Sequence, residues 1–481
     1  MRILLYCPDD FDIIRIIKET KETGRGNIYI IMQDHEITYK IKKSLTYSIL
    51  DGTFYSAMVG FGESFFSVFA VFLNANNIHL GLLGSLPHTL GSLSQIYSNK
   101  LLKLMKSRKR LICAFAFLQG IMYIPIGLVF FFGNLKIIYL IFFVCLYWIF
   151  GMILNPAWNS WMGDLVDENE RGVYFGQRNK ITGFMAFLSF IGGGYILQLF
   201  LNGVQTQYEG FIIIFALALI SRLLSFFFLI KKYEPEYNLT SEHKIRFMDF
   251  LREARYQNCG LLIFYLSLMN LAVYIAGPFF TPYMLYDLKF DYKTFTMVNA
   301  ASLIIKFLTM PLWGEFLDKY GTKKILVVSG LLMPVIPLLW TFSSSTPYLV
   351  LIQVYNGFIW AGFEIASFSF LFDTTLPNQR ATYVAYYNVL NGIAVLIGGI
   401  LGGIIVRYNS LFSSGYFLVF ILSFLTRYAT SFFFLPKLKE ARIVEEISYG
   451  KLLLKILTTR PSRGIIYSPV ILKRDQEPDS N

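Results

Sequence analysis

Two stretches of this 481-residue chain, DLVDENERGVYFGQRN at 164–179 and DTTLPNQRATYVAYYN at 373–388, align with each other without gaps. Identical residues recur at matching positions, and each stretch follows the fourth apolar segment of its half of the chain. An internal repeat that keeps its order predicts two structurally related halves. The identical pairs are Asp164 with Asp373, Asn169 with Asn378, Arg171 with Arg380, Tyr174 with Tyr383, and Asn179 with Asn388.

Long apolar segments surround both copies. Hydrophobic residues make up 55% of the chain and charged residues only 15%, whereas soluble domains are about one quarter charged. A bilayer core of about 30 Å needs about 20 mostly apolar helical residues. We therefore expect an all-α membrane protein whose twelve transmembrane helices form two pseudo-symmetric six-helix bundles. The expected spans are 45–73, 79–97, 111–132, 137–157, 179–201 and 210–230, then 259–286, 293–313, 325–342, 347–372, 382–405 and 410–435.

The basic residues predict how the bundles are oriented. Although the net charge is +12, most of the Lys and Arg residues that lie in connections between the spans fall on one side, as expected for the cytoplasmic side. We therefore predict an integral protein of the plasma (inner) membrane with both termini in the cytoplasm and no nucleic-acid partner. The expected parts are an N-terminal extension at 1–43, bundles at 44–230 and 259–436, a cytoplasmic linker at 231–258 and a cytoplasmic tail at 437–481.

The two terminal segments have mixed composition. Residues 1–43 combine short apolar runs with charged residues and could form a small αβ appendage. In the tail, SYGKLLLKIL at 448–457 can form a short basic amphipathic helix. Such a helix would either lie on the inner leaflet or remain solvated.

Two further pairs of similar segments, each of which we call an echo, relate the halves. SRLLSFFF at 221–228 resembles TRYATSFFF at 426–434, and ESFF at 63–66 lies where GPFF recurs at 277–280. Glycines in the fifth and eleventh spans are expected to let helix backbones approach closely. They are Gly192, Gly193 and Gly194, and Gly398, Gly399, Gly402 and Gly403.

One connection, WGEFLDKYGTKK at 313–324, resembles the loop motif of the major facilitator superfamily. That motif has a glycine, an apolar pair, an aspartate, a basic residue, an aromatic, a second glycine and a basic pair. The corresponding stretch of the first half, SNKLLKLMKSRKR at 98–110, keeps the basic end but lacks the aspartate and both glycines. RGVYFGQRN at 171–179 and LDGTFYSAMVGFGESFF at 50–66 also resemble a poorly characterised bacterial branch of this superfamily. The motif residues expected to act are Gly314, Asp318, Gly321, Lys323 and Lys324.

The resemblance implies a secondary transporter that moves a small organic solute by alternating access, as a symporter or an antiporter, with proton coupling left open. In such proteins the two halves rock about a central site, and the motif-bearing loops can hold the inward mouth shut. The acids of the repeat are expected to pair with its arginines, Asp164 with Arg171 and Asp373 with Arg380. The alternative is that these loops only set the topology.

Ionisable residues inside apolar spans are candidate functional groups, because charge is costly to bury in lipid. Glu63 and Asp51 lie in the first span and Glu364 lies in the tenth. The resemblance favours all three, since spans one, four, seven and ten usually line the cavity in this family. For each, the alternative is a hydrogen-bonded packing role. Aromatic and amide groups in these spans would suit a sugar or a heteroaromatic compound; they include Tyr274, Asn356 and Trp360.

No enzymatic chemistry is predicted. The sequence has no phosphate-binding GK[ST] loop, no metal-ligand spacing among its histidines and cysteines, and no credible catalytic triad, so we expect neither a cofactor nor a metal. The expected partners are a small-molecule solute, membrane lipid and, with coupling left open, protons, and a monomer is expected. Two other classes stay open: a transporter-like membrane sensor or scaffold, and a translocator of lipid or another amphiphile.

Overall fold

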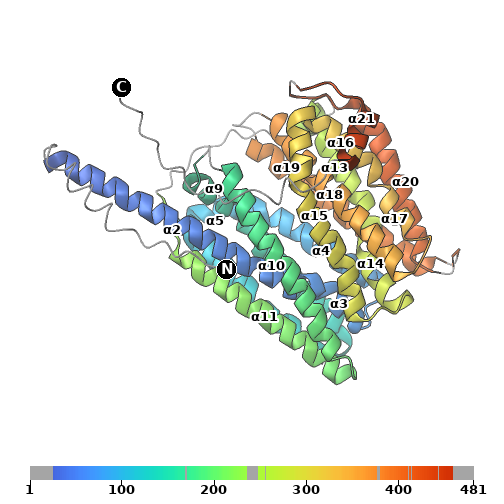
Figure 1. Cartoon of the computed structure of the whole chain (residues 1–481). Coiled ribbons are helices and arrows are strands. Elements are labelled where there is room, and N and C mark those ends of the chain that lie inside the picture. The colour runs from blue at the N-terminus through green and yellow to red at the C-terminus, as the bar shows by residue number, and fades with distance from the viewer. Residues whose placement is uncertain are drawn as a thin grey trace.

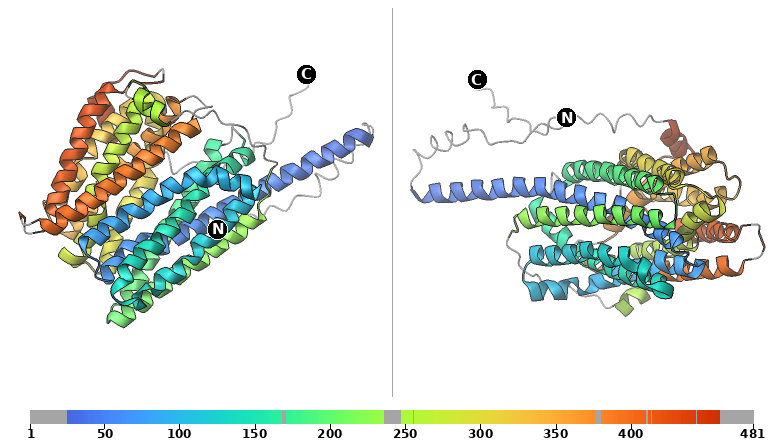
Figure 2. Two further views of the ribbon diagram at one scale, coloured as in Figure 1. Left: turned by 180° about the vertical axis from the view of Figure 1, so that it is seen from behind. Right: turned by 90° about the horizontal axis from the view of Figure 1, so that it is seen from below.

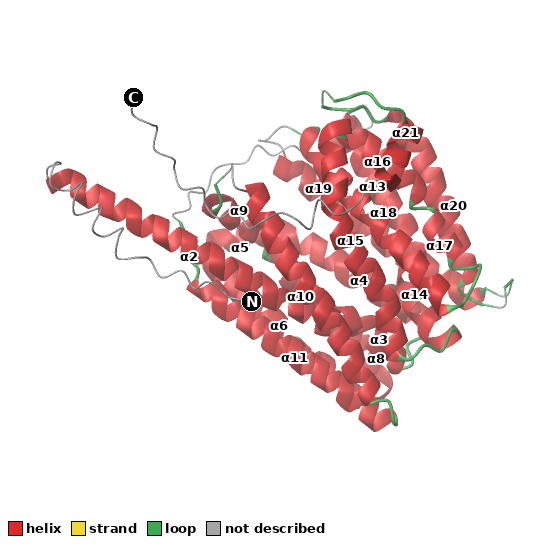
Figure 3. Cartoon of the chain, viewed as in Figure 1, coloured by secondary structure: helices red, strands yellow, loops and turns green. Residues whose placement is uncertain are grey.

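The structure is a computed structural model that describes residues 25–167, 171–235, 247–254, 256–375, 380–409, 411–412, 414–442 and 444–458. In these ranges the regular structure is helical (Figure 3). The long helices pack side by side into one bundle, and the beginning of the first described helix projects from it (Figures 1 and 2).

Each half contains six helical spans, and several spans are divided into two helices. The first half consists of α2 (Arg25–Phe61) with α3 (Phe66–Phe72), α4 (Asn77–Ser94) with α5 (Ser98–Met105), α6 (Arg108–Ile121) with α7 (Tyr123–Leu128), α8 (Lys136–Ile153) with α9 (Asn155–Leu165), α10 (Arg171–Leu199) and α11 (Val204–Lys231). The second half consists of α13 (Asn258–Ala276) with α14 (Phe280–Pro282), α15 (Tyr292–Tyr320), α16 (Thr322–Leu332) with α17 (Val335–Leu339), α18 (Thr346–Asp373), α19 (Arg380–Tyr408) and α20 (Phe417–Phe434). Two short helices lie outside these spans, α12 (Phe247–Glu253) and α21 (Tyr449–Thr458).

Eleven helical segments of the described chain are long and apolar enough to cross a membrane. The remaining span, expected at 79–97, is present as α4 but falls short of that criterion, because it carries polar residues such as His79 and His88. This helix packs against α8 of its own half and α19 of the other, and its Ser85 and Thr89 are buried. Protein therefore covers much of α4, which relieves it of the apolar composition that a lipid-facing span needs.

The first spans of the two halves are broken at matching positions. The 3₁₀ turn η1 (Glu63–Phe65) separates α2 from α3, and η5 (Gly277–Phe279) separates α13 from α14. These turns coincide with the ESFF and GPFF echo of the sequence. A short 3₁₀ stretch inside a helix often marks a functional hinge.

The two halves meet where α4 packs on α19 and where α10 packs on α15. Glycines allow this close packing, as predicted. A Cβ added to Gly399 would lie 2.7 Å from the carbonyl oxygen of Gly81, and one added to Gly194 would collide with Thr296. Small residues thus let the two pairs of helices approach across the interface between the halves.

Apolar packing differs between the two ends of the bundle. We call the end that carries the connection at 320–322 the motif end, and the opposite end the far end. One core contains residues of both halves, including Phe65 and Phe295. Toward the motif end each half has a separate core, around Trp161 in the first half and around Trp313 in the second. Packed apolar side chains therefore join the halves at the far end, while the motif ends are packed independently.

The N-terminal extension is not the expected αβ appendage where it is described. Helix α2 runs without interruption from Arg25 into the first span, so the expected domain boundary at residue 43 lies inside a helix. The segment 27–50 contains neither glycine nor proline, the residues that most often end a helix. Residues 1–24, the part of the linker at 236–246 and the tail after residue 458 lie outside the described residues.

The predicted amphipathic helix of the tail forms as α21, but its surroundings differ from both expectations. It packs against α15 and α16 at the motif end, and Leu452 and Ile456 are buried. Lys455 Nζ donates a hydrogen bond to the Tyr320 hydroxyl at 2.7 Å. The apolar side of α21 is therefore covered by protein instead of facing lipid or water.

Candidate functional site

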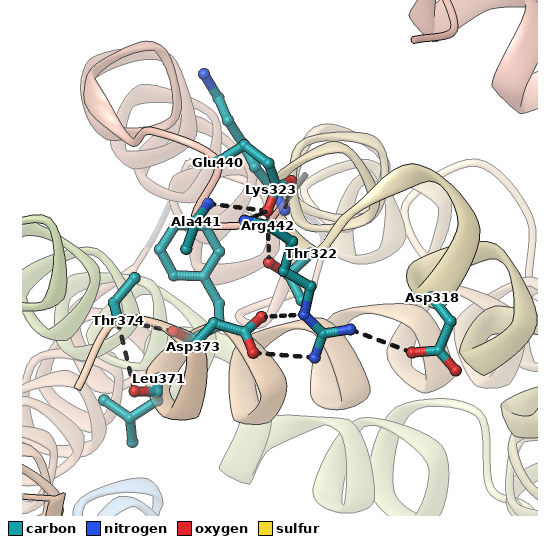
Figure 4. A network of polar contacts seen from close by, with 10 residues as sticks. Asp318, Thr322, Lys323, Leu371, Asp373, Thr374, Glu440, Ala441 and Arg442 are labelled. Carbon is teal, nitrogen blue, oxygen red and sulfur yellow. Dashed lines mark hydrogen bonds and ion pairs between the residues drawn. The ribbon is translucent and has the colours of Figure 1, made fainter. Parts of the chain in front are cut away.

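Arg442, in the tail beyond α20, contacts two of the acids in the loops that are expected to hold the inward mouth shut, which we call the gate. Its Nε and Nη2 donate to the two carboxylate oxygens of Asp373 at 2.8 and 2.9 Å, and its Nη1 donates to Asp318 at 3.2 Å (Figure 4). A bidentate pair of this kind fixes orientation as well as charge. The hydrogen bonds that Arg442 donates to Asp373 are the main cause that raises the pKa of Arg442 above its usual value. The tail therefore connects the motif loop to the end of α18.

Glu440, two residues before Arg442, caps the beginning of α16. Its Oε2 accepts a hydrogen bond from the backbone N–H of Lys323 at 2.9 Å, and its Oε1 accepts one from the Thr322 hydroxyl at 3.1 Å (Figure 4). A carboxylate in this place satisfies free amides of the first turn and complements the helix dipole. Lys324 adds a further link between the motif and the tail, since its Nζ donates to the backbone carbonyl of Glu445 at 3.0 Å.

Of the two motif glycines, only Gly321 is required by the local geometry. It ends α15 and precedes α16 with φ at +95°, a backbone conformation that glycine adopts without strain. A Cβ at this position would also collide with the carboxylate of Glu440. Gly314 lies inside α15, where an added Cβ would meet Ile365 at 3.5 Å, an ordinary contact.

The first half has a related network at the same end of the bundle. Arg108, whose side chain is fully buried, donates to Asp164 at 2.5 Å. Glu234, which follows α11, accepts a hydrogen bond from the backbone N–H of Lys109 at 3.1 Å. Glu234 therefore caps α6 in the way that Glu440 caps α16. The first-half copy of the motif thus keeps a capped helix although it has lost its aspartate and glycines.

The expected partners within the repeat cannot be assigned to contacts. The side chains of Arg171 and Arg380 lie outside the described residues, so their pairing with the repeat acids remains a prediction. Asp164 and Asp373 each have another arginine partner, and in both cases it comes from outside the repeat.

A lysine is buried beside the first-half network. Lys232 directly follows α11, and its Nζ lies 3.3 Å from the sulfur of Met162 and 4.3 Å from the centroid of the Trp161 ring. Burial lowers the pKa of Lys232 to about 8. The sequence placed this residue in the polar linker, so its burial was not expected.

Glu63 lies in the break of the first span. Its Oε2 accepts a hydrogen bond from the Tyr147 hydroxyl at 2.9 Å, and the Tyr123 hydroxyl donates to Tyr147 at 3.3 Å. Both tyrosines are buried. The carboxylate is therefore held by one hydroxyl group of α8, which in turn accepts from a hydroxyl group of α7, inside the first half.

Asp51 belongs to a second buried set in the same half. The Ser225 hydroxyl donates to its Oδ1 at 2.7 Å and accepts from Arg222 Nη1 at 3.0 Å. Arg222 also lies over the ring of Tyr55 at 5.0 Å. These contacts join α2 to α11 and give Arg222 partners inside the first half.

A cavity of about 330 Å³ lies among α13, α18 and α19 of the second half and α4 of the first. It brings together three of the residues predicted for the site, namely Tyr274, Trp360 and Glu364. The Glu364 carboxylate accepts a hydrogen bond from Lys306 Nζ at 2.6 Å, so its charge is paired.

Asn356 does not line this cavity. Its amide donates to Ser302 Oγ at 3.1 Å and to Gln353 Oε1 at 2.8 Å, between α18 and α15. Together with Glu63 and Asp51, this residue lies apart from the other three. The expected substrate residues are thus divided, because three of them line the cavity, Glu63 and Asp51 bind polar groups inside the first half, and Asn356 lies elsewhere in the second half.

Several residues of these networks were not predicted. The two capping carboxylates had a signal, because the second echo continues as SFFFLIKKYE at 225–234 and SFFFLPKLKE at 431–440, ending in Glu234 and Glu440. Comparable positions in the two halves therefore supply the same helix cap. Arg108 and Arg442 had no such signal, since they occupy unrelated positions in the two halves.

Comparison with known proteins agrees with this architecture. The sequence profile of the Major Facilitator Superfamily matches residues 261–471. A D-xylose-proton symporter superposes with a TM-score of 0.65 at 12% identity, covering 84% of this chain and 98% of the other. A variant of the nucleoside transporter NupG gives a TM-score of 0.64 at 15% identity, covering 83% and 100%. At these identities the solved structures establish the fold alone.

A curated relative, an MFS-type transporter of Aspergillus terreus (strain NIH 2624 / FGSC A1156), is 27% identical over 116 residues. The match covers 24% of this chain and 21% of that relative, so it spans about one fifth of the relative's length. The chain has the major facilitator fold, as its loop motif predicted, and its second half matches the Major Facilitator Superfamily profile.

Proposed function

We propose that this protein is a secondary transporter that moves a small organic solute across the membrane by alternating access. The observation that carries the proposal is the division of apolar packing, with a shared core at the far end and separate cores at the motif end. Two bundles connected in this way can rock, so that a site between them opens to one side at a time. The cavity among α4, α13, α18 and α19 gives the solute a binding site of ordinary size.

In this proposal the motif end faces the cytoplasm of the plasma (inner) membrane, in agreement with the distribution of Lys and Arg, and both termini are cytoplasmic. The networks around Arg108 and Arg442 each lie within one half. They keep the end of each bundle rigid while the bundles move, because buried and bidentate ion pairs tolerate little change of geometry. Closure then brings two rigid ends together.

Glu63 is the proposed proton-coupling carboxylate. It lies in a helix break, inside the bundle, with a single tyrosine hydroxyl bound to its Oε2. A carboxylate in such a place can take up and release a proton as the path to water changes during the transport cycle. The proposed partners are the solute, protons and membrane lipid, and the proposed functional unit is a monomer.

Solute uptake into proteoliposomes with an imposed pH gradient tests the proposal, using solutes that raise the melting temperature of the purified protein. We expect the gradient to drive accumulation, and Glu63→Gln to abolish that dependence. The matched control is Glu315→Gln, which changes an exposed carboxylate of α15 and should leave uptake intact. Uptake that does not depend on the pH gradient and is unchanged by Glu63→Gln would rule out the coupling role. No flux of any stabilising solute would favour a sensor or scaffold.

A further inference from the structure

Two residues that line the cavity carry buried polar atoms for which the described protein supplies no hydrogen-bond partner. His88 Nδ1 on α4 and Ser367 Oγ on α18 are buried and make no hydrogen bond in the part of the chain that the structure describes, and both residues line the cavity. A buried polar atom without a partner costs the desolvation of that atom, and native proteins rarely keep one unless water, an ion or a ligand satisfies it. One of these atoms comes from each half.

Two amides on the same cavity wall are fixed by each other. Asn270 Nδ2 on α13 donates to Asn391 Oδ1 on α19 at 2.7 Å, and Tyr387 lies at the edge of this pair, with its hydroxyl 3.5 Å from Asn270 Nδ2. This bond leaves the Asn270 carbonyl oxygen as an acceptor and the Asn391 amide nitrogen as a donor. The wall therefore offers both a donor and an acceptor in fixed positions, which suits hydroxyl groups because a hydroxyl can both donate and accept.

The charge in the cavity is balanced. Glu364 is its acidic lining residue, and Lys306 neutralises it at 2.6 Å. An ammonium ligand would have to compete with Lys306 for the carboxylate, and a carboxylate ligand would approach Glu364 without a free cation on the lining. Leaving one member of such a pair unpartnered is unfavourable away from water. The cavity thus disfavours ligands of either charge.

Aromatic rings supply the remaining surface. The His88 ring lies 6.3 Å from the Tyr274 ring and 5.5 Å from the Trp148 ring, and Trp360 and Tyr387 also face the cavity. Aromatic faces pack well against a flat or gently puckered ring, so the directional hydrogen bonds to such a ring come from other groups of the cavity.

Building on the proposed transport function, we propose that the cavity binds a neutral, polyhydroxylated ring compound, with His88 and Ser367 as hydrogen-bonding partners of its hydroxyl groups. Monosaccharides and nucleosides share this chemistry. In a nucleoside the base would occupy the aromatic side of the cavity, whereas a monosaccharide would present only its own ring.

Equilibrium binding to the purified full-length protein tests this assignment without requiring transport. The probes are D-glucose and D-xylose, uridine and adenosine, and the charged analogues glucuronate and glucosamine. We expect at least one neutral probe to bind, its charged analogue to bind about tenfold more weakly or not at all, and Ser367→Ala to weaken neutral binding about tenfold. His88→Phe, which keeps an aromatic ring but removes the nitrogen atoms, should weaken it similarly.

The matched control is Ser329→Ala, which removes a buried hydroxyl that bonds to a backbone carbonyl within α16, outside the cavity. It should leave binding unchanged, and gel filtration should show the same elution for all three variants. Preference for a charged analogue, binding of no neutral probe, or binding unaffected by both cavity variants would overturn the assignment. Transport of a charged solute would overturn the substrate class and leave the transport proposal standing, whereas neutral binding without any flux would do the reverse.

Discussion

Replacing Gly321 with alanine places a methyl group where the chain has no space for it. The residue has φ at +95°, and the new Cβ would meet the Glu440 carboxylate that caps α16. Forcing a non-glycine residue into such a backbone conformation costs about 1–3 kcal/mol. Displacing Glu440 removes a helix cap worth about 1 kcal/mol. The expected loss of stability is therefore roughly 2–4 kcal/mol.

Gly314→Ala is the matched control, because it makes the same substitution in the same motif. Gly314 has helical geometry within α15, and the new Cβ would make an ordinary contact with Ile365 at 3.5 Å. Alanine is favoured over glycine in a helix interior by about 1 kcal/mol, so this variant should be neutral or slightly more stable.

Thermal unfolding of the detergent-solubilised protein measures the difference. We expect Gly321→Ala to lower the melting temperature by roughly 2–4 °C, and limited proteolysis to cut the tail around Arg442 faster, since the tail loses its attachment to α16. Gly314→Ala should change neither readout. Equal damage by the two substitutions, or none by Gly321→Ala, would refute the reasoning from backbone geometry and the Glu440 cap.

Three further predictions follow from the same contacts. Asp373→Asn should lower the melting temperature more than Asp318→Asn, because Asp373 accepts both bonds of the bidentate pair with a side chain only 15% exposed, whereas Asp318 is 77% exposed and its pair is worth about 1 kcal/mol or less; equal effects would contradict this. Lys232, with its pKa lowered from 10.5 to about 8 by burial, has lost a proton that the unfolded chain still holds between these values, so its contribution to native stability rises with pH there. Relative to Lys232→Met, the free energy of unfolding of the wild-type protein should therefore increase by up to about 3 kcal/mol as the pH rises from 7.5 to 10.5. A difference in melting temperature between the two proteins that stays constant across that range would contradict this. Gly399→Val should separate α4 from α19 at the interface of the halves and stop transport, while Gly163→Val, at a glycine with open space around its Cβ position, should leave transport unchanged.

The fold could be predicted because its strongest determinants are local in sequence. Apolar length identified the spans, and the repeat related the halves before any contact was known. The exception shows the limit of the hydropathy criterion, since α4 is polar for a span and is explained only by its position between α8 and α19. The glycine clusters were interpreted correctly because close helix packing leaves a compositional trace.

The site could be predicted only in part, because ion-pair partners depend on how distant segments meet. Asp318 and Asp373 were predicted to be gate residues, which stays a prediction, yet their shared partner Arg442 comes from a tail that was expected to lie on lipid or in water. Similarly, the unsatisfied atoms of His88 and Ser367 have meaning only once the cavity is formed. The capping pair Glu234 and Glu440 was within reach, since it required only a longer comparison of the two halves.

Distances across the two ends of the bundle test the central claim, which is that the halves rock about the cavity. Spin labels at the exposed positions Lys103 and Glu315 report the motif end, and labels at the exposed positions Asn202 and Lys289 report the far end. In proteoliposomes, adding a solute that binds the cavity should shorten the motif-end distance and lengthen the far-end distance. Two distances that stay unchanged at saturating solute, or that shorten together, would contradict alternating access.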